Sequence, residues 1–174
     1  MAGFITLNAI KRFPESFAAL ILFHAQSIAD TPEVKENYRK AIEQIILNGT
    51  AEFNEKFIRN VFHPNSLTNK KELVESLRSI VFANFKEMIT VGLIALVECF
   101  ETCSSLDSIR IPALIICSRE DVVIPLRNLN LCKHEKRSIL KIIDNARYFS
   151  NLKQPDEFNK SVNNFLNSFD PNNN

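Results

Sequence analysis

The stretch Ile111-Pro112-Ala113-Leu114-Ile115-Ile116-Cys117-Ser118-Arg119-Glu120-Asp121, followed by Val122-Val123-Ile124-Pro125, decides the fold. Its apolar run predicts a short strand over 113–117 that is buried on both faces. A second such run, F-A-A-L-I-L-F at 17–23, predicts another buried strand, and residues 138–143 predict a third. Helical patterns surround these strands. We expect helices at 1–13, from 31 to Gly49, after Thr50, at 70–83, 86–102, 126–134 and 154–169, and a polar loop at 63–69.

Composition excludes several classes of function. The chain has 174 residues, 45% of them hydrophobic and 24% charged, with a net charge of +1, which is typical of a single globular domain without a nucleic-acid or membrane surface. Its three glycines are too far apart for a phosphate-binding loop or a dinucleotide fingerprint. The four cysteines lack secreted-scaffold spacing and predict reduced thiols in the cytoplasm.

Four motifs in order carry a resemblance to the α/β-hydrolase family. The stretch at 111–125 resembles the acid-bearing strand and turn, and 143–158 (I-D-N-A-R-Y-F-S-N-L…Q-P…F) resembles the histidine loop. Residues 1–4 (M-A-G-F) look like the end of the nucleophile elbow, and 12–17 (R-F-P-E-S-F) like the entry to the next strand. The segment A-D-T-P-E at 29–33 is similar to a subgroup with enol-lactonase-like and haloperoxidase-like members.

The resemblance implies a particular fold. It covers essentially the whole chain but corresponds only to the C-terminal part of the family, from just after the nucleophile onward. We therefore expect an α/β fold with about three parallel strands, flanking helices and a four-helix cap insertion. The implied boundaries are a hydrolase core at 1–30 and 104–170, a helical cap at 31–103 and a disordered tail at 171–174.

The resemblance also implies a site, from which two catalytic residues are absent. Family members use a serine activated by a histidine that a carboxylate orients. The serine would stand directly before Met1, whose backbone is then the remnant of the oxyanion hole. Asp121 holds the acid position, although a turn-forming aspartate is the alternative interpretation. Tyr148 holds the histidine position, with Arg147 before it, and a phenol is too weakly acidic to replace imidazole as a base.

Three other candidates have ordinary interpretations. His24 is the one histidine near the strand ends, and we interpret it as structural or substrate-facing rather than catalytic. Ser118 has no base beside it in the sequence, which disfavours it as a substitute nucleophile. Cys99 and Cys103 have a spacing that suits zinc ligands, but no further ligand is nearby and core packing is favoured.

These observations predict a truncated α/β-hydrolase-like protein without catalytic activity on its own, and with no cofactor and no metal. An alternative is an interaction module, or half of a split hydrolase for esters or lactones. That alternative predicts pairing with an N-terminal hydrolase fragment or a second copy through an exposed sheet edge. A third interpretation is an intact hydrolase that continues upstream of Met1.

Overall fold

The computed structural model describes residues 1–99, 109–126 and 138–168. The chain divides into two compact units, and each is described by itself. One unit comprises Ala2–Ile28 and Glu101–Asn174, and the other comprises Met1 and Ala29–Phe100. The helix expected at 126–134 and the tail at 171–174 lie outside the described residues.

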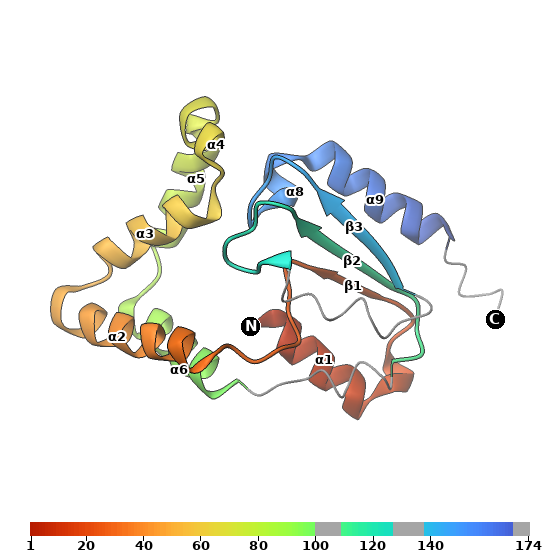
Figure 1. Cartoon of the computed structure of the whole chain (residues 1–174), viewed down its shortest axis with the longest axis horizontal. Coiled ribbons are helices and arrows are strands. Elements are labelled where there is room, and N and C mark those ends of the chain that lie inside the picture. Colours follow the sequence, from red (N-terminus) through yellow and green to blue (C-terminus); the bar gives the residue numbers. More distant parts are fainter. Residues whose placement is uncertain (100–108, 127–137, 169–174) are drawn as a thin grey trace. The chain divides into compact units, whose positions relative to one another are not determined.

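The first unit contains a parallel sheet of three strands in the order β1-β2-β3 (Figure 1). These strands are β1 (Leu20–Phe23), β2 (Ala113–Ser118) and β3 (Ser138–Ile143). The ladder aligns Leu20 with Ala113, and Ala113 with Ser138. Every residue of β2 is buried, as the continuous apolar run predicted. The predicted class, a three-stranded parallel sheet with flanking helices, is confirmed.

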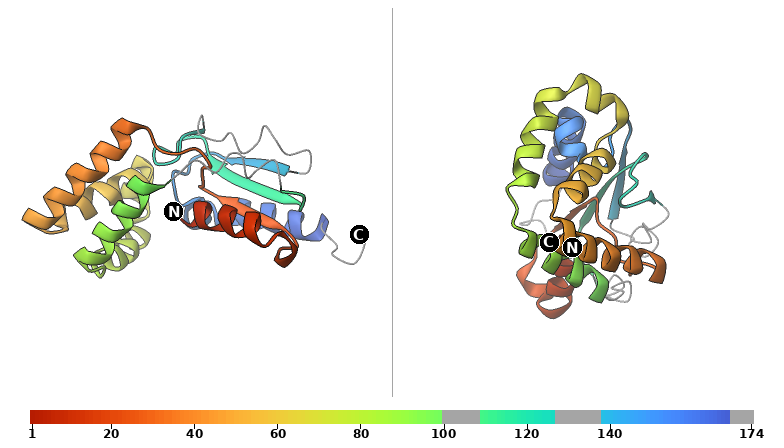
Figure 2. Two further views of the ribbon diagram at one scale, coloured as in Figure 1. Left: turned by 90° about the horizontal axis from the view of Figure 1, so that it is seen from below. Right: turned by 90° about the vertical axis from the view of Figure 1, so that its left-hand side faces the viewer.

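Helices cover both faces of this sheet. Helix α1 (Ala2–Arg12) packs Leu7 and Ile10 against one face, where Leu20, Leu22 and Ile115 point. Helix α9 (Pro155–Ser168) packs Phe165 against the other face, where Leu114 and Ile116 point. Figure 1 and Figure 2 show the two helices on opposite sides of the strands. Alternate side chains of each strand therefore fill two separate apolar layers.

Two expected elements of this unit have different bounds. The strand expected at 17–23 begins only at Leu20, because its partner β2 begins at Ala113 and a 3-10 helix at Pro14–Ser16 precedes it. The closing helix expected at 154–169 is α9, and a short helix that was not expected, α8 (Ser150–Lys153), precedes it. A proline disfavours helical backbone in the residue before it, and Gln154 before Pro155 has φ −130° and ψ 59°.

The second unit is helical and contains five described helices rather than four. They are α2 (Pro32–Asn48), α3 (Ala51–Val61), α4 (Pro64–Asn69), α5 (Lys71–Phe82) and α6 (Lys86–Glu98). The loop expected at 63–69 is wrong, because Pro64 occupies the first helical position and the His63 ring accepts a hydrogen bond from the Asn65 amide at 3.3 Å. Among the described residues no single helix is long and apolar enough to span a membrane. Helices α5 and α6 together have the length and the composition of a span, but the chain bends by 90° at the break between them.

Candidate functional site

Three polar side chains from distant parts of the chain meet where the parallel strands end. His24 directly follows β1, Asp121 follows β2, and Ser150 begins α8 after β3. His24 and Asp121 are each 5% exposed and Ser150 is fully buried. The carboxyl edge of a parallel sheet is where α/β proteins place their functional groups. This cluster is therefore the candidate site.

His24 leaves the end of β1 with an unusual backbone. Its amide donates to the Ile116 carbonyl at 2.9 Å, so it still belongs to the ladder with β2. Its φ is 47°, in the left-handed region, which costs a side chain with a Cβ about 1–2 kcal/mol. The hydrogen bonds of the ring offset that cost, because they are made only when the chain turns here.

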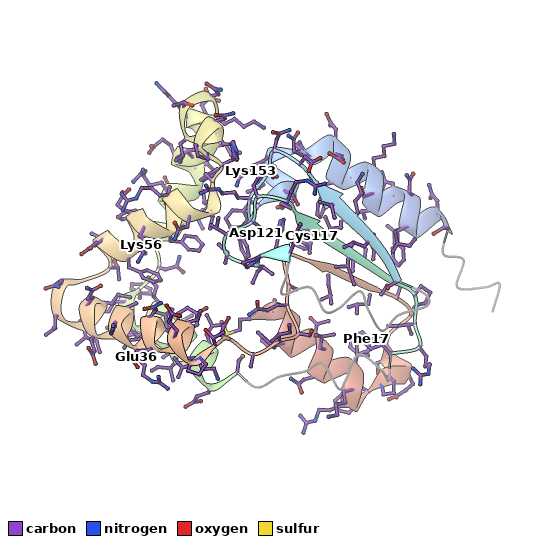
Figure 3. The ribbon with its side chains drawn as sticks, in the orientation of Figure 1. Phe17, Glu36, Lys56, Cys117, Asp121 and Lys153 are labelled. Carbon is purple, nitrogen blue, oxygen red and sulfur yellow. The ribbon has the colours of Figure 1, made fainter. Side chains whose placement is uncertain are left out.

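Asp121 is held by the turn that follows β2, as Figure 3 shows. Its Oδ1 accepts hydrogen bonds from the amides of Val123 at 2.8 Å and Ile124 at 2.9 Å. Its Oδ2 lies 2.7 Å from His24 Nδ1. The turn-forming role and the orienting role, which the sequence left as alternatives, are thus carried by different oxygens of one carboxylate.

Ser150 fixes which nitrogen of the His24 ring carries the proton. The Ser150 amide donates to His24 Nε2 at 3.2 Å, and the Ser150 hydroxyl lies 2.8 Å from the same nitrogen. A backbone amide can only donate, so Nε2 must hold a lone pair. The ring proton is therefore on Nδ1, which donates it to Asp121. This is the tautomer that a catalytic histidine oriented by a carboxylate adopts.

Ser150, His24 and Asp121 are connected in the order of a nucleophile, a base and an acid. The environment of Ser150, however, differs from that of a serine that attacks a substrate. The Ser150 hydroxyl lies within hydrogen-bond distance of the His24 ring, and the ring lies within hydrogen-bond distance of the Asp121 carboxylate. However, the Ser150 hydroxyl has no contact with solvent, and its own backbone amide competes for the lone pair of Nε2. The three groups satisfy one another, as buried polar groups generally must.

Tyr148, at the predicted histidine position, lies beside this cluster. Its ring centroid is 5.4 Å from that of His24 and 5.1 Å from that of Phe149. Burial, followed by the negative charge of Asp121, raises the pKa of Tyr148 above its ordinary value. A phenol whose pKa is raised stays protonated at neutral pH and cannot accept a proton from a serine.

The remaining sequence candidates for the site are Met1, Ser118 and two cysteines. Met1 is 52% exposed and groups with the helical unit, so its role in an oxyanion hole stays a prediction. Ser118 is buried and its hydroxyl has no partner among the described residues. Cys103 lies outside the described residues, Cys99 is a free thiol, and the Cys117 thiol lies 3.7 Å from the Lys141 carbonyl. Within the described ranges, no group of three ligating side chains could hold a metal ion.

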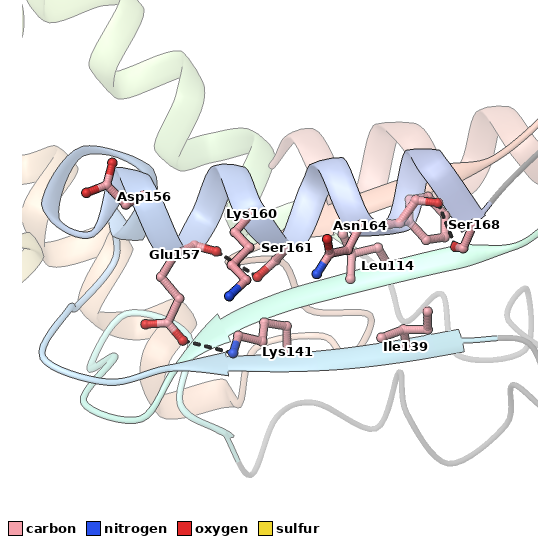
Figure 4. Close-up of a pocket in the computed structure, with 10 residues that line it drawn as sticks. Leu114, Ile139, Lys141, Asp156, Glu157, Lys160, Ser161, Asn164 and Ser168 are labelled. Carbon is pink, nitrogen blue, oxygen red and sulfur yellow. Dashed lines mark hydrogen bonds and ion pairs between the residues drawn. The ribbon is translucent and has the colours of Figure 1, made fainter.

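A shallow groove lies elsewhere in the same unit, between α9 and the sheet (Figure 4). Its lining includes Leu114 and Phe165 at the base and Lys141, Glu157 and Lys160 at the rim. Lys141 Nζ and Glu157 Oε1 form an ion pair of 2.9 Å across it. The groove includes none of the three polar residues of the candidate site, so it is not where hydrolase chemistry would occur.

The sequence indicated Asp121 and placed His24 near the strand ends, but it did not reveal that the two residues are paired. Ser150 was missed entirely. The available signal was positional: His24 and Asp121 each follow an apolar run, and parallel neighbours end at the same edge. Nothing in the sequence specified the left-handed turn that aims the His24 ring at Asp121.

Several of the known proteins that this chain resembles in sequence or in fold are hydrolases. No protein-family profile matches the chain. The chain is 27% identical over 168 residues to "Putative carbamate hydrolase RutD" of Rhizobium rhizogenes, covering 95% of this chain and 64% of that protein. A thermophilic esterase from Thermogutta terrifontis has a TM-score of 0.87 at 20% identity, covering 96% of this chain and 62% of that one. The enol-lactonase from Burkholderia xenovorans has a TM-score of 0.85 at 17% identity, covering 95% and 62%.

The chain spans less than two thirds of the length of each of these proteins. The likeness in sequence to a carbamate hydrolase and in structure to an esterase and an enol-lactonase agrees with the motifs at 111–125 and 143–158. The parallel sheet, its covering helices and the acid after β2 all follow one pattern: the chain has an α/β-hydrolase fold, and its relatives are hydrolases.

Proposed function

We propose that this chain is an α/β-hydrolase-like protein that does not hydrolyse esters on its own. The observation that carries the proposal is the closed hydrogen-bonded cluster of His24, Asp121 and Ser150. Acyl transfer requires the acyl carbon to come within about 3–3.5 Å of the attacking oxygen. The Ser150 oxygen is fully buried and offers no such approach.

The position that the resemblance assigns to the base supports the same conclusion. Tyr148 stands there, and its raised pKa keeps the phenol protonated at neutral pH. Among the described residues, the candidate site thus has an acid and an imidazole, but no accessible nucleophile. We also propose a cytoplasmic location without a cofactor, supported by the spacing of the cysteines in the sequence and by the free Cys99 thiol.

Hydrolysis of chromogenic short-chain esters by the purified chain tests this proposal. We expect the wild type and Asp121→Ala to give the same background rate. Robust turnover that Asp121→Ala abolishes would overturn it, because that variant removes the carboxylate that orients His24.

A second candidate function is one part of a hydrolase for esters or lactones that is completed by an N-terminal hydrolase segment. In the described part of the chain, β1 pairs only with β2, so its other edge has no strand beside it. An unpaired edge offers backbone groups for strand addition. The substrate class follows from the printed activities of the relatives, which are those of an esterase, an enol-lactonase and a carbamate hydrolase.

The helical unit supports an interaction role, with a second copy or an N-terminal hydrolase segment as the partner. Large apolar side chains on α5, on α6 and at the residue before α6 are exposed: Ile80 63%, Phe85 75%, Met88 67% and Val91 63%. Apolar surface of this kind favours association. Light scattering tests this role: a monomer at high concentration that binds no hydrophobic dye would contradict it.

A further inference from the structure

We propose that His24, rather than the residue at position 148, is the general base when a nucleophilic serine is supplied by a segment that precedes α1. The inference rests on the second proposed function, in which the chain is one part of a hydrolase. It assigns a specific residue to proton transfer, and it replaces the interpretation of His24 as structural or substrate-facing.

The first support is the protonation state of the ring. Asp121 accepts the Nδ1 proton at 2.7 Å, and the Ser150 amide requires a lone pair on Nε2. A general base needs a lone pair on one nitrogen and a carboxylate hydrogen-bonded to the other. His24 has both, and the Ser150 hydroxyl at 2.8 Å shows that a serine oxygen can occupy the place opposite Nε2.

The second support is the position at which α1 begins. A Cβ added to Gly3 would lie 2.7 Å from the Ala25 side chain, so the start of α1 is in direct contact with the residue after His24. A residue directly before Met1 is three residues from Gly3, and three residues span at most about 11 Å. A serine there is within reach of the strand end that carries His24.

The third support is the unsuitability of the alternative. The Tyr148 phenol is held protonated by burial and by the charge of Asp121. His24 instead donates its Nδ1–H to the same carboxylate at 2.7 Å. Asp121 therefore orients the imidazole for proton transfer, whereas the phenol of Tyr148 stays protonated.

The proton and electron pairs balance in the proposed step. The serine hydroxyl of the preceding segment attacks the acyl carbon, and its proton moves to His24 Nε2 while Asp121 stabilises the imidazolium through Nδ1–H. The ester or lactone alkoxide leaves with that proton, which gives an acyl-serine. Water then attacks the acyl carbon and gives a proton to His24, which passes it to the serine oxygen as the acyl–serine bond breaks, so that the acid and the free serine are released. The Ser150 hydroxyl must turn away from Nε2, and the hydrogen bond from the Ser150 amide to Nε2 must break, before this sequence begins.

The test joins the full chain at Met1 to the segment of an esterase relative that ends with its elbow serine. We expect ester hydrolysis by this chimera, a loss of kcat of about 100-fold or more in His24→Ala, and partial rescue by added imidazole. His63→Ala, a histidine in the helical unit, is the matched control and keeps the activity. Tyr148→Phe also keeps it.

Three outcomes overturn the proposal: a folded chimera without activity, full activity in His24→Ala, or a loss in Tyr148→Phe with His24→Ala unaffected. Activity of the unjoined chain would instead overturn the first proposed function, so the two failures are distinguishable.

A second measurement needs no chimera and no variant. A two-bond 1H–15N correlation spectrum of the chain reports which ring nitrogens of its three histidines carry a proton. We expect the His24 proton on Nδ1 and a lone pair on Nε2. A proton on Nε2 with a lone pair on Nδ1 would overturn the proposal even if the chimera failed to fold.

Discussion

Replacing His24 with alanine removes the residue that joins three segments of the hydrolase-like unit. Asp121 loses the partner of Oδ2 but keeps two backbone amides on Oδ1, and Ser150 loses the acceptor of its amide. Each buried polar group left without a partner costs about 1–3 kcal/mol, and the lost ring leaves a cavity besides. We expect His24→Ala to lower the free energy of unfolding by about 3 kcal/mol, a large part of the usual 5–15 kcal/mol.

The His24→Gly variant makes this prediction specific. Glycine normally destabilises more than alanine, but His24 has φ 47°, where a Cβ is disfavoured by about 1–2 kcal/mol. We therefore expect His24→Gly to be more stable than His24→Ala by about 1 kcal/mol. Urea unfolding followed by circular dichroism measures the free energy of unfolding of both variants. His63→Ala is the matched control, and we expect it to lower that free energy by about 1 kcal/mol or less. A decrease in the free energy of unfolding of less than about 0.5 kcal/mol in His24→Ala would refute the reasoning. So would a His24→Gly variant that is less stable than His24→Ala.

Two further predictions concern Tyr148 and the glycines. Because the pKa of Tyr148 is raised on folding, its contribution to stability is present below about pH 10 and is lost as the pH rises above that value; Tyr148→Phe should lack this alkaline loss. An absorbance titration at alkaline pH should show the pKa of Tyr148 falling toward its ordinary value in Asp121→Asn, and no change would contradict the charge effect. Gly3→Ala should destabilise by about 1–3 kcal/mol, because the new Cβ meets the Ala25 side chain at 2.7 Å. Gly92→Ala, with only ordinary contact at 3.8 Å inside a helix, should stabilise by about 0.5–1 kcal/mol; equal effects at the two glycines in thermal unfolding would argue against the close approach.

The strands could be predicted because their signal is local. The run at 113–117 is apolar at every position, and such a run is stable only when both faces of the strand are buried. The loop expected at 63–69 was wrong because a polar composition does not by itself prevent a helix. A proline at the first helical position and a capping ring before it are enough to start a helix in a polar segment.

The cluster of the candidate site could be predicted only in part. Asp121 is marked by its place after a buried strand, but its pairing with His24 joins residues that are 97 positions apart. That pairing depends on strand order, on register and on a left-handed turn, and none of these is a property of the local sequence. The same is true of Ser150, whose hydroxyl meets the ring only because β3 ends beside β2.

Labelling with a fluorophosphonate, which reacts with activated serines, tests most directly whether the cluster of Ser150, His24 and Asp121 is closed. The account predicts that the folded chain gains no adduct on Ser150, as judged by intact mass and peptide mapping, because its hydroxyl is fully buried. An adduct on Ser150 that disappears in His24→Ala would contradict it, since that result requires an accessible serine activated by the imidazole.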